Sequence, residues 1–200
     1  MITVIRSELY RLATTRSSAL SLSAFSLSGA VLSVFGADFW ALLAGVGAFG
    51  FGAAGVSQHY LHHTVVLLHL ARPRRVSVLA GQLVTALIVS LGFTAASGLA
   101  VPILWNWEWY AVTLVVAPLM AVFGAAAAAI ARRATFLFVG CTAWVVFVEA
   151  MYGKLQEPLP FSAYVDAASG DMGKLLLLLG WTVAAIAGAV FAVGRDLNGD

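Results

Sequence analysis

Charge is what this sequence has least of. Only 10% of its 200 residues are charged, against roughly a quarter in a soluble domain, while 62% are hydrophobic and the mean hydropathy is +0.95. A chain with so few charges cannot keep most of its surface in water. The sequence contains a single cysteine, Cys141, so no intrachain disulfide can form. The net charge of +2 gives no basic patch for nucleic acid, and no nucleic-acid partner is expected.

Catalytic motifs are missing as well. There is no GxxxxGK[ST] segment, so the chain has no Walker A cradle for phosphates, and neither GxSxG nor HExxH occurs. Residues 45–50 match G-x-G-x-x-G, but they lie inside an apolar run with no preceding strand. Glycines in such a run favour close helix packing in lipid. We therefore predict a packing face here, no enzyme activity and no cofactor bound by this chain.

Six nearly uncharged stretches dominate what is present. A bilayer core about 30 Å thick needs roughly 20 apolar helical residues to cross it. The predicted spans are residues 17–36, 39–56, 77–99, 110–131, 134–152 and 175–194. The sequence thus predicts an all-α integral membrane protein with six transmembrane helices, forming a single transmembrane domain over residues 1–200.

The positive charges lie in alternate gaps between these spans. Nine of the eleven Lys and Arg residues fall on one predicted side: Arg6, Arg11, Arg16, Arg72, Arg74, Arg75, Arg132, Arg133 and Arg195. The other side has Lys154 and Lys174. Short loops rich in Lys and Arg stay in the cytoplasm, so both termini are predicted to be cytoplasmic. Aromatic residues at the predicted outer boundaries favour the headgroup layer: Trp40, Trp105, Trp107, Trp109, Tyr110 and Tyr152.

Two segments outside the spans, residues 1–16 and 153–174, are predicted to form short helices rather than simple loops. In residues 1–16, Ile2, Ile5, Leu9 and Leu12 recur at helical spacing, which predicts an amphipathic helix lying in the membrane interface. Residues 153–174 contain two prolines and few charges, so we predict an extracellular loop of short re-entrant helices packed against the spans.

The gap at residues 57–75 is amphipathic. On a helix it places four histidines on one side, His59, His62, His63 and His69, and it should end near Pro73. The i, i+4 spacing of His59 and His63 could bring two ligands to one metal. No cysteine or acidic residue is near them in the sequence, so we predict no metal site and a polar face that meets a partner or water.

Glu149 is an acidic residue within the fifth predicted span, near its outer end. Carboxylates inside a membrane are costly and usually have a partner or a water-lined path. Two interpretations stay open. The group is solvated at the interface, or paired with Lys154 or the backbone; alternatively, it takes part in a substrate path or its gating.

Several segments resemble the permease subunits of type-2 ATP-binding-cassette (ABC-2) transporters. The opening SELYRLATTRSS is similar to their interfacial helix, with matches at Glu8, Arg11, Leu12, Thr14, Thr15, Arg16 and Ser17. Residues 57–82 resemble their cytoplasmic loop and third span, with matches at Ser57, Thr64, Leu70, Pro73, Arg74 and Arg75. The chain departs from the family pattern at Gln58 and His59, where an acidic residue is usual, at His63 for glycine and at Gln82 for a basic residue.

The resemblance implies the membrane subunit of an exporter in the bacterial plasma membrane. Its substrate would be a hydrophobic or amphipathic compound such as a drug, peptide or lipid. Two ATP-binding subunits, which bind ATP and Mg, and a second copy of this chain or a related permease would complete the transporter in contact with membrane lipid. The interfacial helix carries Glu8, Arg11 and Arg16, and coupling to the ATPase falls on Gln58, His59, His62, His63, Thr64, Arg72, Arg74 and Arg75. The alternatives are an ATPase-independent secondary transporter or channel, and an assembly or sensor protein without transport.

Overall fold

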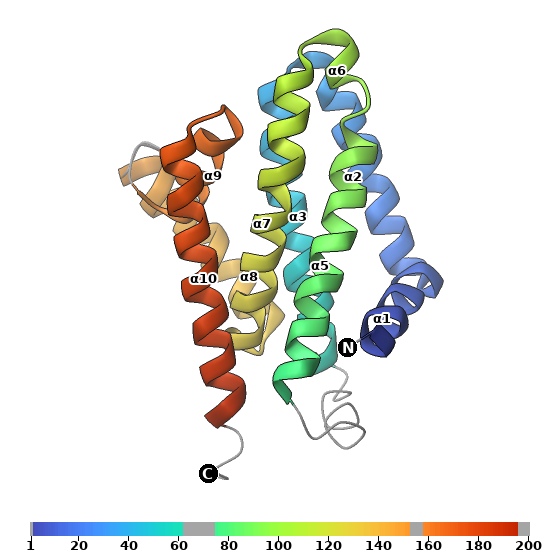
Figure 1. Cartoon of the computed structure of the whole chain (residues 1–200), viewed down its shortest axis with the longest axis vertical. Helices are drawn as coiled ribbons and strands as arrows, with labels where there is room; N and C mark the ends of the chain where they lie inside the picture. Colours follow the sequence, from blue (N-terminus) through green and yellow to red (C-terminus); the bar gives the residue numbers. More distant parts are fainter. Residues whose placement is uncertain (1, 62–74, 153–157, 196–200) are drawn as a thin grey trace.

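The structure, a computed structural model, describes residues 2–61, 75–152 and 158–195, and these ranges are helical with no strand. The elements are α1 (Ile2–Thr14), α2 (Arg16–Phe35), α3 (Ala37–Leu61), α5 (Arg75–Ser97), α6 (Val101–Leu104), α7 (Trp107–Ala131), α8 (Ala134–Ala143), the π-helix η1 (Trp144–Tyr152), α9 (Pro160–Ala168) and α10 (Met172–Arg195). Figure 1 shows them as an elongated bundle with the N-terminus and the C-terminus towards the same end.

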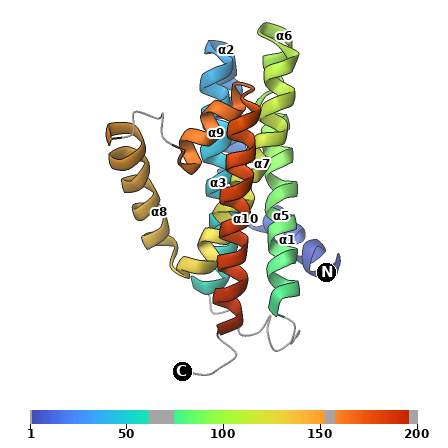
Figure 2. The same ribbon diagram turned by 60° about the vertical axis from the view of Figure 1, so that its left-hand side comes forward.

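Five helices, α2, α3, α5, α7 and α10, are long and apolar enough to cross a membrane. The chain is therefore a multi-pass membrane protein. The fifth predicted span, residues 134–152, is divided into α8 and η1, and its apolar part, Thr135–Glu149, is shorter than the other five helices. We call α8 and η1 together the α8–η1 arm. It stands apart from the other long helices, with α9 between it and α10 (Figure 2).

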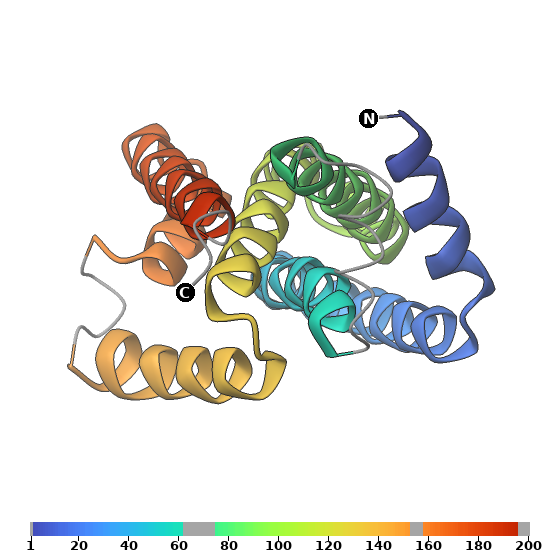
Figure 3. The same ribbon diagram turned by 90° about the horizontal axis from the view of Figure 1, so that it is seen from below.

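Helix α7 forms the centre of the bundle. In the most apolar 18-residue stretch of each helix, 61% of the residues of α7 are buried, compared with 22% for α10 and 11% for α2. Seen along the bundle in Figure 3, α7 lies among α3, α5 and α10, while α1 and the α8–η1 arm lie at the periphery. Helix α2 and the arm thus leave much of their apolar surface uncovered by the rest of the chain.

The small residues of α3 and α7 let these two helices approach closely. A Cβ added at Gly52 would overlap the carbonyl oxygen of Ala121, and one at Gly124 would overlap the carbonyl oxygen of Phe49. The packing face predicted for residues 45–50 is confirmed at Gly45 and Gly47, where a Cβ would overlap the rings of Tyr164 and Phe93. In the same stretch, a Cβ at Gly50 would have no atom within 4 Å. The glycines of α3 therefore allow close contact with more than one neighbouring helix, whereas Gly50 faces open space.

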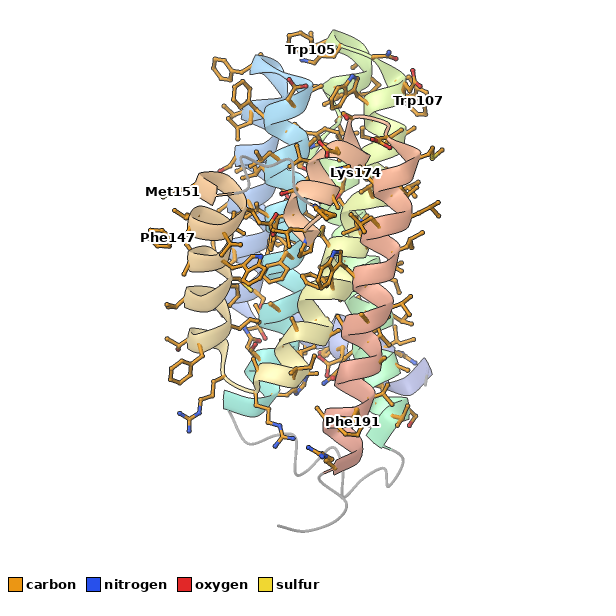
Figure 4. All side chains as sticks on the ribbon, turned by 90° about the vertical axis from the view of Figure 1, so that its left-hand side faces the viewer. Trp105, Trp107, Phe147, Met151, Lys174 and Phe191 are labelled. Carbon is orange, nitrogen blue, oxygen red and sulfur yellow. The ribbon has the colours of Figure 1, made fainter. Side chains whose placement is uncertain are left out.

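Neighbouring helices cover two of the aromatic residues at the predicted outer boundary. Trp40 is fully buried, its indole Nε1 donates to Ser97 Oγ over 3.1 Å, and its ring stacks on Tyr110 at 5.8 Å between centroids. Neighbouring helices supply the polar partners of Trp40 and of Tyr110, whose hydroxyl donates to Ala95 O over 3.3 Å, and the depth of these two rings in a membrane stays a prediction. Trp105 and Trp107 are exposed at the end of the molecule away from the termini (Figure 4).

The two ends of the bundle differ in their residues. We call the end that carries the termini, Arg132, Arg133 and Arg195 the arginine end, and the end that carries α6, Trp105 and Trp107 the tryptophan end. Helix α3 reaches the arginine end and continues through Leu61, so residues 57–61 extend the second predicted span rather than beginning a new segment. His62, His63, Thr64, Arg72 and Arg74 lie outside the described residues.

Candidate functional site

A cavity of about 880 Å³ lies between α2, α3, α5 and the α8–η1 arm. Its size falls within the range of roughly 300–1,000 Å³ that is typical of small-molecule sites. Aromatic and aliphatic side chains form most of its wall, including Phe25, Phe49, Phe51, Phe138, Val145 and Phe161. Helix α2 adds the hydroxyl groups of Ser17, Ser18, Ser21 and Ser23, and α3 adds the open face of Gly50. The lining suits a mainly apolar molecule that carries some polar groups.

A polar cluster forms the end of this cavity towards the arginine end. Arg11 donates from Nε and Nη2 to Glu8 Oε2, over 3.2 and 2.9 Å, and from Nη1 to Gln58 Oε1 over 3.0 Å. His59 Nε2 lies 2.9 Å from Glu8 Oε1. Glu8, Arg11 and Gln58 are among the residues that line the cavity. The four residues, which we call the Glu8 cluster, therefore join α1 to the last turns of α3.

Burial and charge act in opposite directions on Glu8, which is only 6% exposed. Burial raises the pKa of its carboxyl group, but the hydrogen bonds and charges of His59 and Arg11 outweigh this and hold the pKa below its ordinary value of 4.5. Glu8 is therefore charged at neutral pH, and its charge is balanced inside the cluster.

The cluster unites residues that sequence analysis assigned to separate segments. Glu8 and Arg11 were predicted on the interfacial helix, and Gln58 and His59 in the loop for ATPase coupling. The prediction that His59 lies on a face open to a partner or water is wrong, because His59 is 4% exposed and packs against Glu8. The residues next to His59 in the sequence include no acidic group, but α1 brings the carboxylate of Glu8 beside it. Among the described residues, no group of three or more His, Cys, Asp or Glu side chains could hold a metal ion.

The other predicted residues of this region are not part of the cluster. Arg16 is exposed at the first residue of α2, and Gln82 on α5 lines the cavity. Arg75 is the first residue of α5.

A second buried carboxylate lies where the α8–η1 arm meets α9. Glu149 is fully buried and accepts hydrogen bonds from Trp144 Nε1 over 3.0 Å, from Ser162 N over 2.6 Å and from Ser162 Oγ over 2.8 Å. The backbone N–H of Phe161 also donates to it, over 3.4 Å. The first N–H groups of a helix have no partner within the helix and favour a negative charge, so Glu149 satisfies the start of α9. Of the predicted partners, the backbone is the one found; Lys154 lies outside the described residues.

Phe161 connects this second cluster to the cavity. Its side chain lines the cavity and packs edge-on against Phe49 of α3, with 5.3 Å between ring centroids. Glu149 stands out in the sequence as an acidic residue within an apolar span, whereas Ser162 and Phe161 carry no such signal because these side chains are ordinary in an apolar loop.

Comparison with known proteins does not extend these observations: no protein-family model, curated protein or solved structure matches the chain. The cavity and its two polar clusters are therefore the features that bear on function.

Proposed function

We propose that this chain is the permease subunit of an ABC-2 exporter that moves a hydrophobic or amphipathic compound across a bacterial plasma membrane. The cavity is the observation that carries the proposal. It lies within a bundle of membrane-length apolar helices, is large enough for a small molecule, and combines aromatic walls with serine hydroxyls and a charged end. An amphiphile could place its apolar body against the aromatic wall and its polar group towards Glu8 and Arg11.

The proposed topology has six crossings with both termini in the cytoplasm, so that the arginine end is the inner end. The Lys and Arg distribution supports this orientation. Helix α7 ends at Ala131, and α10 runs back towards the same end as far as Arg195 (Figure 1). The chain must return to the tryptophan end between them, and the α8–η1 arm followed by α9 provides this return.

Coupling to an ATP-binding partner would reach the cavity through the Glu8 cluster. Two ATPase subunits, binding ATP and Mg, would dock at the inner end, near the loop that follows α3. A push on Gln58 and His59 would be transmitted to α1 because both residues contact its charged side chains. A second copy of this chain, or a related permease, would complete the transporter and surround the path.

Purification of the tagged chain from its native membrane tests this assembly. We expect an ATP-binding subunit with a Walker A motif to be retained in equal numbers with the permease. Reversing the charge at Arg72, Arg74 and Arg75 together should weaken its retention, whereas reversing the exposed Arg133 should not. Purification of an intact dimer that never contains an ATPase would contradict the proposal.

The buried carboxylate of Glu149 is the observation that favours the alternative, an ion-coupled transporter without an ATPase. Flux in vesicles that follows an imposed ion gradient, needs no ATP and is abolished by Glu149→Gln would support that alternative. Flux that depends on ATP hydrolysis would refute it.

A further inference from the structure

We infer that Glu149 is a positioning residue: it holds the first turn of α9 to the α8–η1 arm, and thereby keeps Phe161 over the end of the cavity nearest the tryptophan end. Its role in substrate passage rests on the proposed function, whereas the contacts themselves do not.

Phe161 forms part of the wall of the cavity on the side of the tryptophan end. Helix α3 starts at the tryptophan end, and its contribution to the lining begins only at Val46, so its outer turns lie beyond the cavity. At this depth Phe49 and Phe161 meet edge-on, 5.3 Å apart between centroids. Phe161 is the residue that α9 contributes to the lining, and α9 lies in the half of the bundle nearer the tryptophan end (Figure 1). Moving the first turn of α9 would therefore open this end.

The α8–η1 arm is the wall of the cavity that has the least support. Phe147 and Met151 point away from the bundle and are 63% and 67% exposed (Figure 4). Phe138 and Val145, on the opposite side of the arm, line the cavity. The arm changes from α-helix to π-helix at Trp144, and π-helical segments are rare and often occur at functional sites. A ligand that enlarges the cavity would displace this wall more easily than the packed pair α3 and α7.

Glu149 links that movable wall to the closing residue. Three of the groups that face its carboxylate can only donate hydrogen bonds: Trp144 Nε1, Phe161 N and Ser162 N. A carboxylate offers two acceptor oxygens to these donors. A glutamine of the same size would offer one acceptor and turn its NH₂ group towards donors. Glu149→Gln should therefore release α9 from the arm with little change in volume.

Cys141 provides the test, because it is the single cysteine of the chain, is half-buried on α8 and lines the cavity. The rate of its modification by a charged, membrane-impermeant thiol reagent is measured in sealed vesicles, with the reagent applied to one face at a time. From the tryptophan-end face, Glu149→Gln should raise the rate about tenfold or more over that of the unsubstituted chain, as expected when the hydrogen bonds of a buried side chain are lost. From the arginine-end face the rate should not change.

Three controls separate closure from general loosening. Glu108→Gln changes an exposed carboxylate at the start of α7 and should leave both rates unchanged. Phe161→Ala should open the same end without altering the carboxylate. Adding Glu149→Gln to Phe161→Ala should then increase the rate no further, whereas a merely structural role for Glu149 would predict multiplied effects.

Unchanged labelling in Glu149→Gln, or multiplied effects in the double variant, would overturn the inference. If Glu149→Gln does not yield folded protein, the same labelling rates are measured for Ser162→Ala and Phe161→Ala. Ser162→Ala removes the hydrogen bond of 2.8 Å from the Ser162 hydroxyl to Glu149. Failure of both to raise the tryptophan-side rate would be equally decisive. The measurement needs neither ATPase nor substrate, so absence of an ATPase would refute the proposed function and leave this result standing. The face from which the unsubstituted chain is labelled reports its orientation separately.

Discussion

At the scale of single residues, Glu8 has more influence on this protein than its place near a chain terminus suggests. Its two carboxylate oxygens face different partners, with Arg11 on one and His59 on the other. Replacing it by glutamine removes the charge and leaves Arg11 without its counter-ion in a partly buried site. We expect Glu8→Gln to lower the free energy of unfolding by about 1–3 kcal/mol, measured by denaturant unfolding in detergent micelles. Glu108→Gln, at an exposed carboxylate, is the matched control and should be neutral.

The same residue should make stability depend on pH. Because the pKa of Glu8 is lower in the folded state, its contribution is present above the ordinary value of 4.5 and is lost as the pH falls through the folded pKa. Thermal unfolding below pH 4.5 should therefore show a steeper loss of stability in the unsubstituted chain than in Glu8→Gln. Parallel curves for the two proteins would show that Glu8 does not carry this dependence.

Sequence analysis identified Glu8, Arg11, Gln58, His59 and Glu149, but not how they are paired. Arg11 and Gln58 are 47 positions apart, so no local pattern relates them. His59 looked exposed because it is polar and lies in an amphipathic stretch; it is buried because Glu8 from α1 supplies its partner. Only the arrangement of α1 against α3 decides between these two environments.

At the scale of elements, the contact between α3 and α7 should be sensitive to single methyl groups. Gly52→Ala would place a Cβ against the backbone carbonyl of Ala121, which cannot move aside as a side chain could. We expect a loss of about 1–3 kcal/mol in the free energy of unfolding, typical of overpacking. Gly50→Ala, two residues away on the same helix and facing open space, should be neutral or slightly stabilising, because alanine has the higher helix propensity. Equal effects of the two substitutions would contradict the described packing.

The long helices could be predicted to within a few residues because membrane-length apolar runs leave little choice of structure. The end of α3 was missed, since Ser57 and His59 read as the start of a polar loop. The division of residues 134–152 into α8 and η1 was also missed. Hydropathy shows that a segment is apolar, but it does not show whether neighbouring helices cover that segment. For residues 134–152 the neighbouring helices leave much of the apolar surface uncovered.

At the scale of the whole molecule, the number of crossings determines on which sides the two termini lie. If the α8–η1 arm crosses the membrane, the chain has six crossings and both termini lie on one side; with five crossings they lie on opposite sides. Reporter fusions at each terminus, active on only one side of the membrane, should both indicate the cytoplasm. A periplasmic signal from the C-terminal fusion alone would show that the arm does not cross.

The central claim is that the cavity between α2, α3, α5 and the arm binds the transported compound. The most direct test is ATP-driven transport of a fluorescent amphiphile in vesicles by the chain purified together with the ATPase subunit that we propose for it. The unsubstituted chain should transport the amphiphile, and Gly50→Trp, which would project a large ring into the cavity, should strongly reduce transport while the complex still assembles. Gly180→Trp, on an exposed face of α10, should retain transport. Undiminished transport by an assembled Gly50→Trp complex would contradict the claim.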